Sequence, residues 1–278
     1  MISPRRDKPS NEEQEEEQEM ALDEKQIARI QALLAKAAST EFEGEADVYL
    51  AKAAALMAKY DLDEADVRMA QAAATGETFS EEIGTWRMEV STTGNYTKAR
   101  INAIFNMVHA MGGRSFFTIV KGTGVGYRQH TSMTIIAQES ILANLKLFIP
   151  AALLHMENIA EKTAKDAIKR AKENGTFDRQ TAYVARRSFM RGFGEGVAER
   201  IRSQRDEDLA SGPDSHALVL RSRAKALNDY MDTRYPDLRA SRARGGSEDH
   251  QARRTGKNTG RAFGSPNVGN GGRKALSA

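Results

Sequence analysis

Helix start signals followed by apolar residues at helical spacing recur within residues 22–75, and this pattern constrains the fold most. Asp23 and Gln26 have the spacing of a capping box, in which each side chain bonds the backbone of the other, so a helix is expected to begin there. The apolar residues that follow share one helical face: Ile27, Ile30, Leu33, Leu34 and Ala37. A short helix with one apolar face is stable only against a partner, so a compact helical module is expected.

Two further segments can supply that partner. Apolar residues from Tyr49 to Tyr60 again fit one helical face, and Thr40 and Glu43 are candidate cap residues before them. Asp63 can cap a third short helix that runs to about Ala74. Residues 22–75 are therefore predicted to form a three-helix module.

The residues of this module resemble a known family. The segment LDEKQIARIQALLAKAASTEFEGEADVYLAKAAALMAKYDLDEADVR, residues 22–68, is similar to the domain of unknown function 2786 of bacterial and bacteriophage proteins. Residues 215–238 (SHALVLRSRAKALNDYMDTRYPDL) and the closing residues resemble the region that commonly follows it. The resemblance implies a bacterial or phage context and brings no established catalytic or binding residues. The module itself is expected to serve as a surface for docking a protein partner or for self-association.

Composition excludes several classes of site and location. No run of about eighteen apolar residues is present, so no membrane span is expected. The first residues lack the apolar core of a secretory signal, which predicts the cytoplasm, and that of the bacterial host if the protein is phage-encoded. The chain has no cysteine, so disulfides, thiolate zinc sites and a cysteine nucleophile are excluded.

A second unit is predicted over residues 84–206, with a small sheet. Ile83–Val90 alternates enough for a strand, and Thr97 is a candidate cap for a helix that ends at Gly112 and Gly113. The β-rich runs Ser115–Lys121 and Arg128–Ala137 are joined by a glycine-rich connection, which predicts a β-hairpin. A mostly helical α+β fold follows from these strands and the helices around them.

Two long helices complete that unit. The first is expected from Gln138 to about Lys172, with Pro150 inside it as a kink or a split, because proline lacks a backbone donor. The second is expected over about 179–205. Gly192 and Gly196 lie four residues apart within it, which favours close packing against another helix; a phosphate-cradling turn is the alternative. A linker and helix should occupy 207–238.

Charge is distributed unevenly along the chain, although its net value is only +3. Residues 1–25 hold nine acidic and four basic side chains, and residues 1–21 are predicted to be an acidic disordered tail. Residues 160–205 hold twelve basic and six acidic side chains, and residues 236–278 hold nine and three, so each stretch carries a net charge of +6. Residues 239–278 are expected to be a basic, glycine- and arginine-rich tail, either free or docked in part.

These basic stretches point to a DNA or RNA partner, because clustered Lys and Arg bind phosphates by releasing counterions. An ordinary solvated face with pairs such as Glu161 and Lys165 explains the helical residues slightly better, because a basic face alone is weak evidence. The candidate nucleic-acid-binding residues lie on the two long helices and in the tail: Lys165, Lys169, Arg170, Arg186, Arg187, Arg191, Arg242, Arg244, Arg253, Arg254, Lys257 and Arg261.

No catalytic motif is recognisable, so catalytic residues, a metal and a cofactor are not expected. The five histidines lack the spacing of metal ligands, and no serine lies in a nucleophile motif. The prediction is a non-enzymatic, nucleic-acid-binding accessory protein. One alternative is a helical protein–protein adaptor that uses its alanine-rich faces. Another is a hydrolase or nuclease whose carboxylates are far apart in the sequence.

Overall fold

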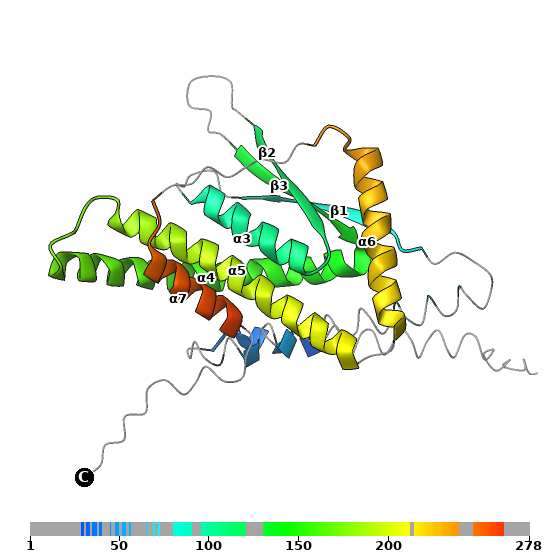
Figure 1. Cartoon of the computed structure of the whole chain (residues 1–278), viewed down its shortest axis with the longest axis horizontal. Coiled ribbons are helices and arrows are strands. Elements are labelled where there is room, and N and C mark those ends of the chain that lie inside the picture. Colours follow the sequence, from blue (N-terminus) through cyan, green and yellow to red (C-terminus); the bar gives the residue numbers. More distant parts are fainter. Residues whose placement is uncertain are drawn as a thin grey trace, which may run out of the picture.

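The computed structural model describes residues 80–90, 96–120, 130–211, 214–238 and 247–263, and separate positions between 29 and 72. It is mostly helical with one small sheet, which confirms the predicted α+β class (Figure 1). The elements, in chain order, are β1 (Ile83–Glu89), α3 (Thr97–Ala110), β2 (Arg114–Val120), β3 (His130–Gln138), α4 (Glu139–Glu173), α5 (Thr181–Ser211), α6 (Asp214–Arg234) and α7 (His250–Ala262).

The sheet has three antiparallel strands in the order β1-β3-β2, so β3 is central. Strands β2 and β3 pair with each other, which confirms the predicted hairpin, while its glycine-rich connection lies outside the described residues. Alternate residues of β3, Met133, Ile135 and Ala137, are buried in the main core. The alternation follows because successive strand side chains point to opposite faces.

Helices α3 and α4 pack against the sheet, and α5 packs on both of them (Figure 1). Ile104 of α3, Phe148 of α4 and Phe193 of α5 are completely or almost completely buried in one shared core. Helices α3 and α5 run parallel, because Tyr96 contacts Tyr183 near their first turns and Gly194 packs on Ala103 further along. The close approach at Gly194 leaves no room for a side chain there.

The first of the long helices, α4, is continuous through Pro150. Of the two predicted outcomes, the split is therefore wrong, and the kink stays a prediction. The proline is exposed, and the missing donor interrupts only one hydrogen bond of a long, well-packed helix. By length and composition α4 could also cross a membrane. Its residues Leu145, Phe148 and Ile149 are buried inside the fold, however, as expected of a core helix.

The start of α3 differs from the prediction by one position. Its N-cap residue is Tyr96, with no capping hydrogen bond from the side chain, and Thr97 is the first helical residue. The expected Thr97 cap is therefore wrong. Tyr96 contributes instead through its ring, which packs against Tyr183 of α5.

The described positions of the N-terminal module are helical wherever they fall between 29 and 39 or between 45 and 72. Ile30, Ala37 and Ala53 are buried in the same core as α3–α5. Ala65 packs with Val219 of α6 in a smaller cluster. The module therefore shares its apolar face with the rest of the chain. The acidic run over 1–21 and the predicted Asp23 cap lie outside the described residues.

Candidate nucleic-acid interface

Part of the predicted basic tail is a helix docked on α5. In α7, Asp249 is the N-cap: its side chain accepts a hydrogen bond from the backbone N–H of Ala252 at 2.9 Å. The backbone N–H of Asp249 donates to Ser188 Oγ of α5 at 3.0 Å. The end of α7 is held by Phe263, whose buried ring meets Phe148 and Phe193. The prediction for residues 239–278 did not anticipate this helix.

Glycines let α5 and α7 approach backbone to backbone. A Cβ atom at Gly192 would lie 2.1 Å from the carbonyl oxygen of Arg253, and one at Gly196 would lie 2.1 Å from that of Lys257. On α7, a Cβ at Gly256 would lie 2.1 Å from the carbonyl oxygen of Phe189. The predicted close packing of Gly192 and Gly196 against another helix is thus confirmed.

The basic residues of α7 that flank these glycines pair with acidic residues. Arg253 donates to Glu195 at 2.6 Å and to Glu248 at 2.7 Å. Lys257 and Arg261 share Glu199, at 2.5 and 2.6 Å. Hydrogen bonding to Glu195 raises the pKa of Arg253 above its usual value. These three cations hold α7 on the surface of α5.

The two cations that pair with Glu199 also change its pKa. Partial burial alone would raise its pKa, but hydrogen bonds from Lys257 and Arg261 outweigh burial and lower the pKa below its usual range. Glu199 therefore stays ionised at neutral pH and remains available to both cations.

The three arginines at the beginning of α5 are also engaged. Arg186 donates to Glu157 at 2.7 Å and lies over the ring of Tyr96. Arg187 lies over Tyr183 and donates to the backbone oxygen of Ser247. Arg191 is 3.9 Å from Glu248. These contacts tie α5 to α3, to α4 and to the segment that leads into α7.

A second group of predicted residues stays exposed. The side chain of Lys165 is 73% exposed and pairs within its own helix, 3.0 Å from Glu161. Lys169 on α4 and Arg254 on α7 are exposed as well. Arg170 of α4 donates to the side-chain oxygen of Gln251 in α7. This bond joins α4 to α7, one turn from Arg254. We call Lys165, Lys169, Arg170 and Arg254 the α4–α7 basic face.

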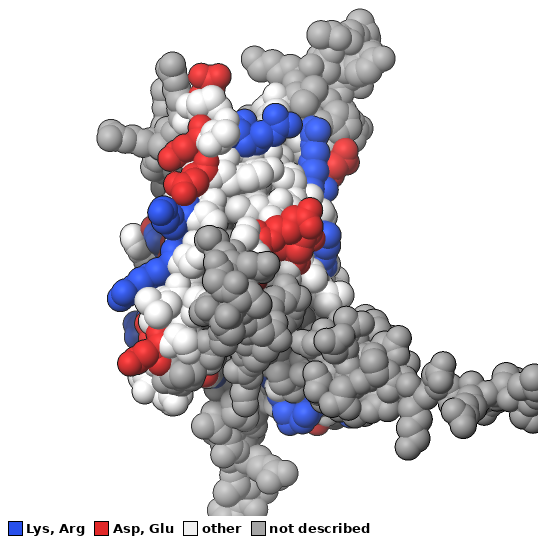
Figure 2. Space-filling model, turned by 90° about the vertical axis from the view of Figure 1, so that its right-hand side faces the viewer, with Lys and Arg blue, Asp and Glu red and all other residues white. Residues whose placement is uncertain are grey.

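The remaining candidates, Arg242 and Arg244, lie outside the described residues. Figure 2 shows another side of the molecule, where basic and acidic side chains are interspersed over the part of the chain that is drawn in colour. On that side, positive charge does not form a continuous stripe.

A basic cluster that the sequence patterns did not indicate lies where α3 ends. Partial burial lowers the pKa of His109, and the charges of Arg114, Arg202 and Arg205 lower it further, against a hydrogen bond that raises it. The parallel packing of α3 and α5 brings these residues together. Arginines near the end of α3 also interact favourably with the negative end of that helix.

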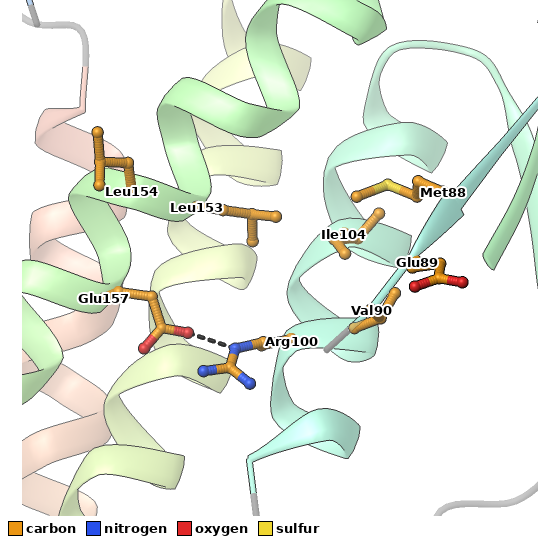
Figure 3. Close-up of a pocket in the computed structure, with 8 residues that line it drawn as sticks. All are labelled: Met88, Glu89, Val90, Arg100, Ile104, Leu153, Leu154 and Glu157. Carbon is orange, nitrogen blue, oxygen red and sulfur yellow. Dashed lines mark hydrogen bonds and ion pairs between the residues drawn. The ribbon is translucent and has the colours of Figure 1, made fainter. Parts of the chain in front are cut away.

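A pocket of about 320 Å³ opens between β1, α3 and α4 (Figure 3). Most of its lining is apolar, with Met88, Ile104 and Leu153 among the walls. Arg100 and Glu157 point toward one another at one side, 2.5 Å apart. Both oxygens of Glu157 accept from arginine, since Arg186 takes the other one, so this carboxylate is committed to ion pairs.

A group of carboxylates close together in space, outside this pocket, would favour the hydrolase or nuclease alternative. Among the residues that the structure describes, no group of three or more His, Asp or Glu side chains is placed to hold a metal ion.

Comparison with known proteins identifies one region. The model of a family described as "Protein of unknown function (DUF2786)" matches residues 25–64. Neither a curated protein nor a solved structure matches this chain. The matched residues lie within the N-terminal module and end before β1, so the match says nothing about the sheet or about α3–α7. The chain therefore carries a DUF2786 region at residues 25–64.

Proposed function

We propose that this protein is an accessory factor that binds the phosphate backbone of DNA or RNA through its α4–α7 basic face. The hydrogen bond between Arg170 and Gln251 carries this proposal. It places Arg170 of α4 beside α7, about one turn from Arg254, and so brings together two basic stretches that are about eighty residues apart in the sequence. The resemblance of the N-terminal region to bacterial and phage proteins suggests the cytoplasm of a bacterium as the setting.

The exposed members of this face suit phosphate contacts rather than base reading. Lys165, Lys169 and Arg254 are exposed, and long cationic side chains reach phosphates without a defined backbone geometry. Aromatic residues, which would stack on bases, make up only 6% of the chain. The binding is therefore expected to be salt-sensitive and largely independent of sequence.

The paired cations have a different role in this proposal. Arg253, Lys257 and Arg261 neutralise acidic residues of α5 and its surroundings, so they fix the position of α7. They contribute to binding by holding Arg254 beside α4. This division separates the ten described candidate residues into anchoring residues and contact residues.

A triple charge reversal tests the contact residues. Lys165→Glu, Lys169→Glu and Arg254→Glu together should weaken binding to short single- and double-stranded oligonucleotides at least tenfold at about 0.1 M salt. Because each lost phosphate contact removes about 0.9 from the slope of log affinity against log salt on duplex DNA, the slope should fall by about 2–3. Fluorescence anisotropy over a salt series measures both quantities.

The control is a triple reversal of the same charge at exposed positions outside this face: Lys98→Glu, Lys146→Glu and Arg221→Glu. Lys146 lies on α4 itself, about 28 Å from Lys165 along the helix axis, well beyond the screening length of about 10 Å in ordinary buffers. The control should keep most of the affinity. Equal losses in both triple variants, or an unchanged protein that binds none of the oligonucleotides, would refute the proposal.

A further inference from the structure

Strand β2 is an edge of the sheet with apolar side chains exposed upon it. Among the described residues, β2 pairs with β3 alone, and Figure 1 shows it at the outer side of the sheet. Phe117 is 41% exposed and Ile119 is 45% exposed. These two are among the few large apolar side chains that the described part of the chain leaves open.

Beyond its first residue, β2 lacks the devices that usually protect an edge. The charge of Arg114 lies at the start of the strand, where its side chain donates to Asn228 of α6, and residues 115–120, SFFTIV, contain no charge, no proline and no glycine. Natural edge strands are commonly guarded by lysine, proline or a bulge, because an open edge offers unpaired N–H and C=O groups to another strand. An unguarded edge with exposed apolar residues is typical of a surface that pairs with a second strand.

The spacing of the exposed residues identifies a second copy of this chain as the partner. We propose that two molecules pair through β2 in antiparallel orientation, about a twofold axis that passes through Thr118. This arrangement places Phe117 of each copy opposite Ile119 of the other. Cross-strand pairs of an aromatic and a β-branched residue are favourable, and both exposed side chains become covered at once.

Other registers of the two strands pair the exposed apolar side chains less well. In a continuous sheet, directly opposed residues must lie on the same face, so the axis must pass through a residue rather than between two. An axis through Phe117 would place Ile119 opposite Ser115 and leave its apolar surface without an apolar partner. The axis through Thr118 is the register that matches Phe117 with Ile119. It joins two three-stranded sheets into one of six strands.

The dimer should be reversible, because strand pairing with two apolar side chains per copy buries less surface than a typical permanent interface. Sedimentation equilibrium of the full-length chain at about 1–100 µM should show a mass that rises from 30.6 kDa toward twice that value. Ile119→Lys should remain at the monomer mass across the range, because each copy would then place a lysine against the other's Phe117.

The matched control is Leu218→Lys, which changes another exposed apolar residue, 54% exposed on α6. It should dimerise like the unchanged chain. Monomeric unchanged protein over the whole range contradicts the proposal, and so does an Ile119→Lys variant that dimerises as before.

A crosslink makes the test independent of how well Ile119→Lys folds. The chain has no cysteine, so Thr118→Cys introduces a single thiol at the proposed axis. Opposed residues in an antiparallel pair have Cβ atoms about 4.5–5.5 Å apart, within reach of a short bifunctional thiol reagent. Thr118→Cys should crosslink to a dimer, and Leu218→Cys at the same concentration should not. Equal yields from the two variants would rule out this pairing.

Discussion

Gly256→Ala is expected to lower the free energy of unfolding by about 2–3 kcal/mol, since overpacking typically costs about 1–3 kcal/mol or more. The added methyl group would lie 2.1 Å from the carbonyl oxygen of Phe189. Gly256 and Phe189 both lie within helices, so neither backbone can move aside locally. Helices α5 and α7 would have to separate to accommodate it. Denaturant unfolding gives the magnitude. The rate of amide hydrogen exchange should increase most in α7, because its contacts with α5 would loosen first.

The sign of this result is informative, because alanine normally stabilises a helix by about 1 kcal/mol relative to glycine. Asn258→Ala, on the exposed side of the same helix, therefore provides the control and should be neutral or slightly stabilising. A Gly256→Ala protein as stable as the unchanged one would show that α7 does not approach α5 this closely in solution.

Arg223→Ala is expected to destabilise the protein by about 3–5 kcal/mol, the usual cost of removing one partner of a buried ion pair. The side chains of Arg223 and Glu81 are only 5% and 9% exposed, and two nitrogens of the guanidinium hold the carboxylate at 2.5 and 2.6 Å. Gln138 of β3 also donates to the backbone oxygen of Arg223 at 3.1 Å. Removal of the arginine leaves a buried carboxylate with its ion-pair partner gone.

A double-mutant cycle separates the pair from simple loss of packing. Arg223→Met with Glu81→Leu replaces both charges by apolar side chains and should recover most of the stability that either single change loses. Arg221→Ala, on the exposed side of α6, should have little effect. Unfolding can be followed through Trp86, the single tryptophan, in the neighbouring strand β1. Additive effects of the two single changes would show that the pair is not coupled.

The elements with a clear local pattern were predictable. The three strands and α3–α5 occur where alternation and helical spacing placed them, because their apolar faces are formed by residues two to four positions apart in the sequence. Pro150 does not split α4, although a split was one of the two predicted outcomes. Proline is unfavourable in a helix interior, but long-range packing of α4 outweighs the loss of one hydrogen bond.

Helix α7 was missed for a physical reason. Its buried positions are Ala252, Gly256 and Gly260, so it has no apolar stripe, and glycine disfavours an isolated helix. Two signals could have indicated it: the potential cap Asp249, and the four-residue spacing of Gly256 and Gly260, which repeats that of Gly192 and Gly196. Both become meaningful only when α5 is known to be the partner.

The sequence by itself determined the strands, the long helices, the DUF2786 resemblance and the amount of basic charge, because each is encoded in nearby residues or in composition. Only the tertiary structure decided which charges are committed to the fold. The pairs of Arg253, Lys257 and Arg261 with Glu195 and Glu199 join residues about sixty positions apart, and a count of charges cannot reveal such pairs. Among the described candidate residues, tertiary packing thus left Lys165, Lys169 and Arg254 exposed and outside the ion pairs between helices, because coulombic pairing depends on distance in space.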